Sequence, residues 1–317
     1  MNKNYGLTTC GGGIYRGDGE NPFFTLVGAE AKITELHIKD GCQRIEEKAL
    51  EEREELCRLS IPPSVKTIGF MAFYGCTSLS EVLFSEGLEY ISACAFYDCA
   101  IKALRLPNSV KYIGDDSFSI IGLNEVTLPC GVEYVGGGAF THNDKKYNEY
   151  SGGYYLGSDS NPYLCLVRPK DICVFEFTVH KDCKIIYSSA FKQCRSLEEI
   201  KLPNGVLHIG KGAFRECGNL KAVYLPDGLR VIDECAFADC AKLSDIKIPR
   251  GKITIEAAAF MGCSSLTELE LMGATVDDNA FDGCLSLERV TVGPEASLLG
   301  DDIFSDCPRV KINRLVK

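Results

Sequence analysis

Short segments in which apolar and polar residues alternate recur along the chain every 22 or 23 residues. In one of them Leu59 and Ile61 flank Ser60, which is the pattern of a strand with one buried face. A second marker, usually phenylalanine, recurs every 21 to 23 residues except for one step of 51. The marker positions are Leu50, Phe73, Phe96, Phe118, Phe140, Phe191, Phe214, Phe237, Phe260, Phe281 and Phe304. A period between 20 and 29 residues is the signature of a solenoid, so we predict eleven stacked coils.

The best-formed repeat is LSIPPSVKTIGFMAFYGCTSLSEV, residues 59–82. Proline follows the alternating segment in several copies, where it ends the strand without removing a ladder hydrogen bond. Each coil is therefore predicted to run from a strand through a proline corner, a V-x-x-I segment and an A-F segment to the next strand. Coils of this kind stack on one another, and the ends of the stack need caps.

The long step of 51 residues contains an insert whose frame also occurs near the amino end. Residues 12–27 read GGIYRGDGENPFFTLV and residues 152–167 read GGYYLGSDSNPYLCLV. Apolar runs flank a polar turn in both copies, which predicts a β-hairpin. The predicted order is an N-terminal hairpin cap over 1–29, repeats 1–5 over 30–140, an inserted hairpin over 141–172 and repeats 6–11 over 173–317.

Composition narrows the classes of partner. The chain is 45% apolar and carries a formal net charge of -10, which indicates a folded chain without the clustered cations that bind phosphates. We therefore expect no nucleic-acid partner. No apolar run reaches the roughly 18 residues of a membrane span, and the amino end shows no export signal. These two observations predict a cytoplasmic chain without a membrane span.

Seventeen cysteines are present, and eight of them follow the repeat phenylalanine by three positions. These eight are Cys76, Cys99, Cys194, Cys217, Cys240, Cys263, Cys284 and Cys307. Neighbouring coils lie about 4.8 Å apart, so distance alone permits disulfides along this column. In a reducing compartment we expect free thiols that act as small buried packing groups. No C-x-x-C or H-x-x-x-H pair occurs, so no metal site is expected.

No motif for catalysis is complete. Residues 205–212, GVLHIGKG, approach a phosphate-binding loop, but Gly212 stands where the loop needs a hydroxyl. The segment also keeps the repeat register, because Val206 and Ile209 match Val65 and Ile68. We therefore predict a protein that is not an enzyme and that binds no cofactor.

The unit L-x-x-I-x-I-P-x-x-V-x-x-I-G-x-x-A-F-x-x-C, which spans about residues 30–313, resembles the BspA-like (Treponema-type) leucine-rich repeat. The resemblance implies an α/β repeat solenoid, curved and right-handed, here interrupted by a β-hairpin. A parallel β-sheet would line its concave face, and short irregular or helical segments its convex face. It also implies binding or adhesion, often at the surface of host-associated microbes, which makes a surface or secreted location the alternative to the cytoplasm.

Residues between the inward strand positions are expected to face outward. Their Glu and Lys side chains either only solvate the sheet and offset each other across strands, or form the surface for a partner. Tyr224 stands between Lys201 and Lys247 in successive repeats, and aromatic and cationic side chains dominate interface energetics. The candidate contact residues are Lys201, Tyr224, Lys247, Glu270, Leu83, Arg105 and the hairpin tyrosines Tyr154, Tyr155 and Tyr163. The predicted function is a non-catalytic interaction or adhesion module for a protein or glycan. The alternative is a structural spacer without a specific ligand, and the oligomeric state is not predicted.

Overall fold

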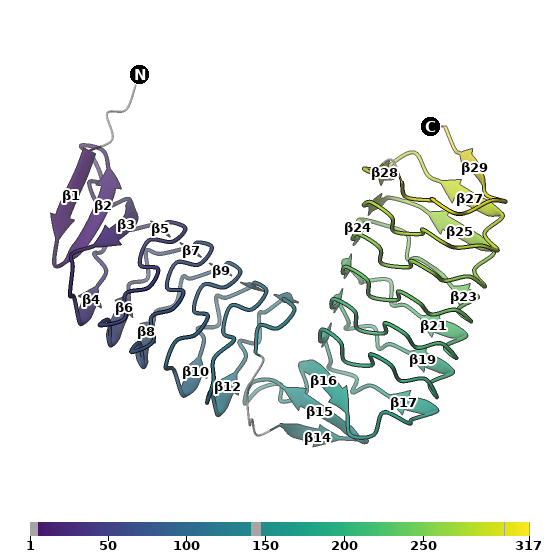
Figure 1. Ribbon diagram of the computed structural model, residues 1–317, viewed down its shortest axis with the longest axis horizontal. Helices are drawn as coiled ribbons and strands as arrows, with labels where there is room; N and C mark the ends of the chain where they lie inside the picture. The colour runs from purple at the N-terminus through teal and green to yellow at the C-terminus, as the bar shows by residue number, and fades with distance from the viewer. Residues whose placement is uncertain (1–5, 141–146, 301, 317) are drawn as a thin grey trace. The chain divides into compact units, whose positions relative to one another are not determined.

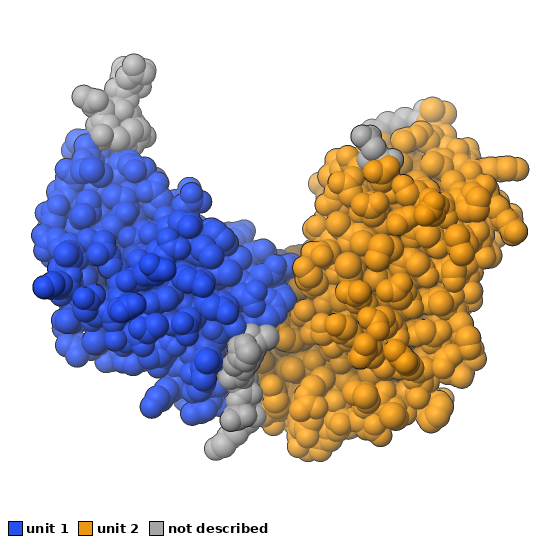
Figure 2. All heavy atoms as spheres, viewed as in Figure 1, with its two compact units in different colours: residues 1–146, 157–160 blue, residues 147–156, 161–317 orange. Residues whose placement is uncertain are grey.

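A computed structural model describes residues 6–140, 147–300 and 302–316 (Figure 1). They divide into two compact units (Figure 2). Unit 1 holds residues up to 146 together with 157–160, and unit 2 holds 147–156 and the chain from 161 onward. The first six residues of the predicted inserted hairpin, 141–146, lie outside the described residues.

Each coil contributes two strands, and we call them the A strand and the B strand in chain order. The A strands of unit 1 are β4 (Glu35–His37), β6 (Arg58–Ile61), β8 (Glu81–Phe84), β10 (Ala103–Arg105) and β12 (Glu125–Thr127). Its B strands are β5 (Arg44–Ile45), β7 (Thr67–Ile68), β9 (Tyr90–Ile91), β11 (Tyr112–Ile113) and β13 (Tyr134–Val135). Successive B strands pair in parallel, and the A strands pair in parallel within two separate sheets, β4-β6-β8 and β10-β12, so unit 1 is a parallel β-solenoid.

Unit 2 repeats this plan. Its A strands are β17 (Glu176–Thr178), β19 (Glu199–Lys201), β21 (Ala222–Tyr224), β23 (Asp245–Ile246), β25 (Glu268–Leu271), β27 (Arg289–Val292) and β29 (Lys311–Arg314). Its B strands are β18 (Ile185–Ile186), β20 (His208–Ile209), β22 (Val231–Ile232), β24 (Ile253–Ile255), β26 (Ala274–Val276) and β28 (Ser297–Leu298). The B strands form one continuous ladder, whereas the A strands form two sheets, β17-β19-β21-β23 and β25-β27-β29.

Both copies of the repeated frame form three-stranded antiparallel sheets. The first is β1 (Gly6–Cys10), β2 (Gly13–Gly17) and β3 (Thr25–Ala29), and the second is β14 (Asn148–Tyr150), β15 (Gly153–Leu156) and β16 (Cys165–Pro169). The outer strands β1 and β14 lie within the predicted regions 1–29 and 141–172 but were not among the two strands predicted for each hairpin. The third strand of each sheet pairs in parallel with the first B strand, β3 with β5 and β16 with β18. The repeated frame therefore covers the first edge of the B ladder.

The described residues contain no helix, so the α/β class is not confirmed and the irregular alternative holds for the A-F segments. Backbone hydrogen bonds explain this outcome. In one coil the N–H of Phe237 donates to the carbonyl of Ala259 in the next coil at 2.7 Å, where a helix would need a bond within the segment. Cys235 and Asp239 on either side adopt positive φ angles of 55° and 62°, which a right-handed helix excludes.

The core of each unit is a stack of the repeat phenylalanines. In unit 2 the rings from Phe191 to Phe304 are nearly parallel, with centroids 5.0 to 5.7 Å apart. Phe73, Phe96, Phe118 and Phe140 stack in the same way in unit 1. The predicted cysteine column lies beside these rings. The column thiols donate to the marker carbonyl of the preceding coil, as Cys240 does to Phe214 at 3.1 Å, which satisfies a buried acceptor with a small side chain.

Candidate functional site

The outward positions of the A strands in unit 2 form an exposed row. Lys201 of β19 and Tyr224 of β21 are direct neighbours in the parallel register, and Lys247 directly follows β23, the next strand. Lys201, Lys247 and Glu270 are exposed, and 43% of the surface of Tyr224 is accessible. The sequence-predicted residues therefore lie together on one face of unit 2.

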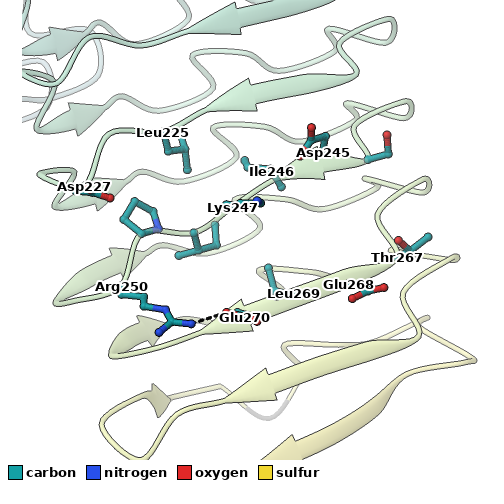
Figure 3. A pocket seen from close by; sticks show the side chains of 13 residues that line it. Leu225, Asp227, Asp245, Ile246, Lys247, Arg250, Thr267, Glu268, Leu269 and Glu270 are labelled. Carbon is teal, nitrogen blue, oxygen red and sulfur yellow. Dashed lines mark hydrogen bonds and ion pairs between the residues drawn. The ribbon is translucent and has the colours of Figure 1, made fainter.

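This row crosses a break in the A-strand sheet. β23 pairs with β21 and β25 pairs with β27, but these two sheets are separate. A groove with a volume of about 710 Å³ opens at the break (Figure 3). We call it the split groove; it is lined by Leu225, Asp245, Ile246, Lys247, Arg250, Glu268, Leu269 and Glu270, among others.

A difference in corner length coincides with the split. The B strands of the two coils pair directly, with Thr254 opposite Thr275. The corner that leads to this pair takes eight residues from Ile246 to Thr254 but only six from Leu269 to Thr275. The A strands β23 and β25 that precede these unequal corners do not pair. The sequence carries this signal in the step of 21 between Phe260 and Phe281, which was not used to predict a groove.

Charges in the split groove are separated along the strands. Figure 3 shows Asp245 and Glu268 near the right-hand end and Arg250 at the left-hand end. Arg250 forms an ion pair with Glu270 at 3.4 Å, and Glu268 pairs with Arg289 of the neighbouring strand β27. The floor is apolar, because Ile246 and Leu269 are 7% and 4% exposed. Arg250 was missing from the sequence-predicted set.

Acidic residues near Tyr224 raise the pKa of its phenol. Its pKa is raised above the ordinary value by the negative charge of Glu199, by partial burial and by the charge of Asp245. Tyr224 therefore stays protonated well above neutral pH and can donate a hydrogen bond to a partner.

Two candidate residues lie in unit 1. Leu83 of β8 is 58% exposed, so it is available for an apolar contact. Arg105 of β10 is exposed and forms an ion pair with Glu125 of β12 at 2.8 Å. β8 and β10 belong to separate sheets, so Leu83 and Arg105 are not paired neighbours.

The hairpin tyrosines differ in their surroundings, and the prediction for Tyr155 is wrong. Tyr155 is fully buried, and its hydroxyl accepts the N–H of His180 at 3.1 Å, as Tyr15 accepts that of Lys39 in the first copy. Because burial removes it from any partner, Tyr155 holds the sheet onto the first coil instead. The presence of tyrosine at this position in both copies was the sequence signal for that structural role.

Tyr163 and Tyr154 remain partly accessible. The ring of Tyr163 packs 4.1 Å from that of His180 and edge-on to Tyr155 at 5.6 Å, so it contributes to the core. Tyr154 lies on the surface of β15, with the guanidinium of Arg168 4.7 Å from its ring centroid. Of the two, Tyr154 presents the cationic and aromatic combination that binding sites use.

The segment 205–212 has no free loop to hold a phosphate. Its backbone belongs to the B ladder, where Gly210 N–H donates to the carbonyl of Ile186 and Gly212 N–H to that of Glu234. His208 is buried with Nε2 3.3 Å from the carboxylate of Asp233. Within the described ranges, no three side chains of His, Cys, Asp or Glu gather closely enough to hold a metal.

Burial keeps most of the column thiols protonated. It raises the pKa of Cys76 to about 11 and that of Cys194 to about 12, whereas a hydrogen bond with Cys284 lowers the pKa of Cys307. A thiol must lose its proton to act as a nucleophile or a ligand. The column is therefore a packing element.

In the part of the chain that the structure describes, no helix has the length and apolar content to cross a membrane.

The match to a family model agrees with this architecture. The family model described as "BspA type Leucine rich repeat region" matches residues 43–151 and 184–311. No curated protein matches the chain. A leucine rich cell surface protein from Faecalibacterium prausnitzii is 21% identical, with 100% of this chain and 97% of that chain covered and a TM-score of 0.42. A leucine-rich repeat protein from Bacteroides ovatus is 22% identical, with 100% of this chain and 99% of that chain covered and a TM-score of 0.38.

Proposed function

Because the chain belongs to the BspA-type leucine-rich repeat family, we propose that it is a non-catalytic interaction module that binds a partner on the A-strand face of unit 2. The match to the family model confirms the resemblance that the repeat unit indicated. The observation that carries the proposal is the exposed row Lys201, Tyr224 and Lys247 beside the split groove. A tyrosine next to an apolar floor is a frequent interface anchor, and the flanking lysines supply charge complementarity to a partner.

The proposed partner surface is the A-strand sheet of unit 2; the family resemblance implies a parallel sheet on the concave face. The A-strand face carries charges of both signs, so it favours a partner with complementary charges over a uniformly charged polymer. A protein can supply complementary charges directly, whereas a glycan would contact chiefly the ring of Tyr224.

Alanine replacement of Lys201, Tyr224 and Lys247 together tests the proposal. Anchor residues contribute about 1 to 2 kcal/mol each, so affinity for a partner captured by the native protein should fall at least about tenfold. A matched control replaces Arg195, Lys242 and Leu285, which are equally exposed but precede the A strands. The assay is capture from cell extracts and glycan arrays, followed by titration of the purified partner.

A structural spacer is the competing function. If the chain is a spacer, the triple replacement of Lys201, Tyr224 and Lys247 leaves every interaction unchanged, and so does the control replacement. The same alternative applies to the hairpin, which we propose caps or joins coils. Replacing Tyr154 by isoleucine, the residue at position 14 of the first copy, separates the two roles, because a contact role predicts weaker binding at unchanged stability.

The adhesion form of the proposal requires an extracellular location. Protease treatment of intact cells measures this directly, because a displayed chain is cleaved while a cytoplasmic marker remains whole. Protection of the chain would restrict the proposal to partners inside the cell.

A further inference from the structure

The split groove places two strand edges opposite each other. Asp245 N–H donates to the carbonyl of Lys221 in the preceding coil at 3.0 Å, so the alternation along a strand directs the backbone groups of Ile246 to the other edge. On β25, the carbonyl of Thr267 accepts from Arg289 at 3.2 Å, which directs the backbone groups of Glu268 toward β23. β23 and β25 do not pair in the described sheets, and such edges are templates for an added strand.

We propose that an extended segment of a protein partner adds as a parallel strand between β23 and β25, with a basic side chain beside Asp245 and Glu268. The inference rests on the proposed function and names the chemistry of its partner. The groove volume of about 710 Å³ lies within the roughly 300 to 1,000 Å³ of sites that enclose a ligand.

The charges of the groove define the sequence of that segment. An outward side chain at the first position would lie between Asp245 and Glu268, so it must be cationic. The next side chain points inward over Ile246 and Leu269, so it is apolar. The third lies between Lys247 and Glu270. Because Glu270 already pairs with Arg250, a neutral polar residue that accepts a hydrogen bond from Lys247 fits there.

The chain itself contains this pattern. β27 presents Arg289 opposite Glu268, Val290 opposite Leu269 and Thr291 opposite Glu270, and the guanidinium of Arg289 pairs with Glu268. One edge of β25 therefore already accepts a strand with the order basic, apolar, polar. The opposite edge adds Asp245, which strengthens the selection for a cation at the first position.

Fluorescence polarisation with a labelled peptide of sequence LERVTVGP, residues 287–294, tests the proposal on the full chain. We expect saturable binding that weakens about fivefold when the arginine of the peptide is changed to glutamate, because cross-strand charge pairs contribute up to about 1 kcal/mol. Methylation of the backbone nitrogen of the first valine should weaken binding about tenfold by removing one hydrogen bond and adding a clash.

The protein variant for this test is Asp245→Lys, with Glu199→Lys as its matched control. Glu199 occupies the same register position two strands earlier, on a strand that is paired on both edges. Asp245→Lys should weaken the native peptide about fivefold, and Glu199→Lys should leave its affinity unchanged.

Equal binding of the methylated peptide, or equal effects of the two variants, would overturn strand addition in the split groove. So would a response to glycans without any response to peptides. Dimers that form in sedimentation without peptide uptake would assign the groove to a second copy of the chain. If these tests fail while the Lys201, Tyr224 and Lys247 replacement still abolishes partner capture, the proposed function stands and only the strand addition falls.

Discussion

The phenylalanine stack predicts that the cost of removing one ring depends on its place in the stack. Phe237 is fully buried and has parallel neighbours at 5.0 and 5.1 Å, whereas Phe304 is half-buried with one neighbour at 5.7 Å. A buried phenylalanine replaced by alanine typically costs 3–5 kcal/mol, and each aromatic pair contributes about 0.5 to 1.5 kcal/mol beyond burial. We therefore expect Phe237→Ala to lower the free energy of unfolding by about 4 kcal/mol and Phe304→Ala by about 2 kcal/mol.

Urea denaturation monitored by circular dichroism gives the free energy of unfolding of each variant, and native-state hydrogen exchange shows which coils are destabilised. Each coil contacts only its neighbours, so Phe237→Ala should accelerate exchange mainly in the coils around residues 214–260. Equal losses for the two variants, or uniform acceleration across unit 2, would refute the nearest-neighbour reasoning.

Two further predictions concern the cysteines and the repeated frame. The pKa of three buried thiols is raised, to about 11 for Cys76 and about 12 for Cys183 and Cys194, so between about pH 8.5 and these values these three ionise only in the unfolded chain. Their contribution to stability is complete below that pH and is lost toward pH 11 to 12; urea titrations under reducing conditions should show this decline, and a Cys76→Ala variant should show a shallower one. Gly153→Ala should lower the melting temperature, because its methyl group would lie 2.8 Å from the Phe177 ring and 2.9 Å from Tyr155, and overpacking costs about 1 to 3 kcal/mol. The control Gly218→Ala adds a methyl group with no heavy atom within 4 Å, and an equal effect of both changes would contradict the packing argument.

The repeated frame shows what local pattern can and cannot predict. Apolar runs around a polar turn predicted strands β2 and β3, because both runs belong to the frame itself. β1 was missed because GLTTC carries little apolar alternation, and it is held by pairing with β2. Asn21 illustrates the same limit. Its side-chain amide donates to the carbonyl of Gly41 in the first coil at 2.8 Å, a contact over 20 residues that no turn pattern contains.

The sequence likewise predicted one part of the candidate site and missed another. The inward and outward positions of the A strands follow from period 2, so Lys201, Tyr224 and Lys247 could be placed on one face from the sequence. The split groove could not, because it lies where β23 and β25 do not pair, and pairing is decided only when two coils are brought together. The burial of Tyr155 likewise depends on its hydroxyl reaching the backbone of His180.

By itself the sequence determined the solenoid, its period, its phenylalanine and cysteine columns and its outward face, because each coil repeats one local rule and meets only its neighbours. Tertiary structure decided the absence of helix in the described residues, since the backbone N–H groups of the A-F segments bond to the next coil. It also decided where the A-strand sheet opens, since the hydrogen bonds of a ladder depend on the relative lengths of two adjacent coils. Departures from the repeat therefore bear on where the split groove opens, and the repeat itself carries the fold.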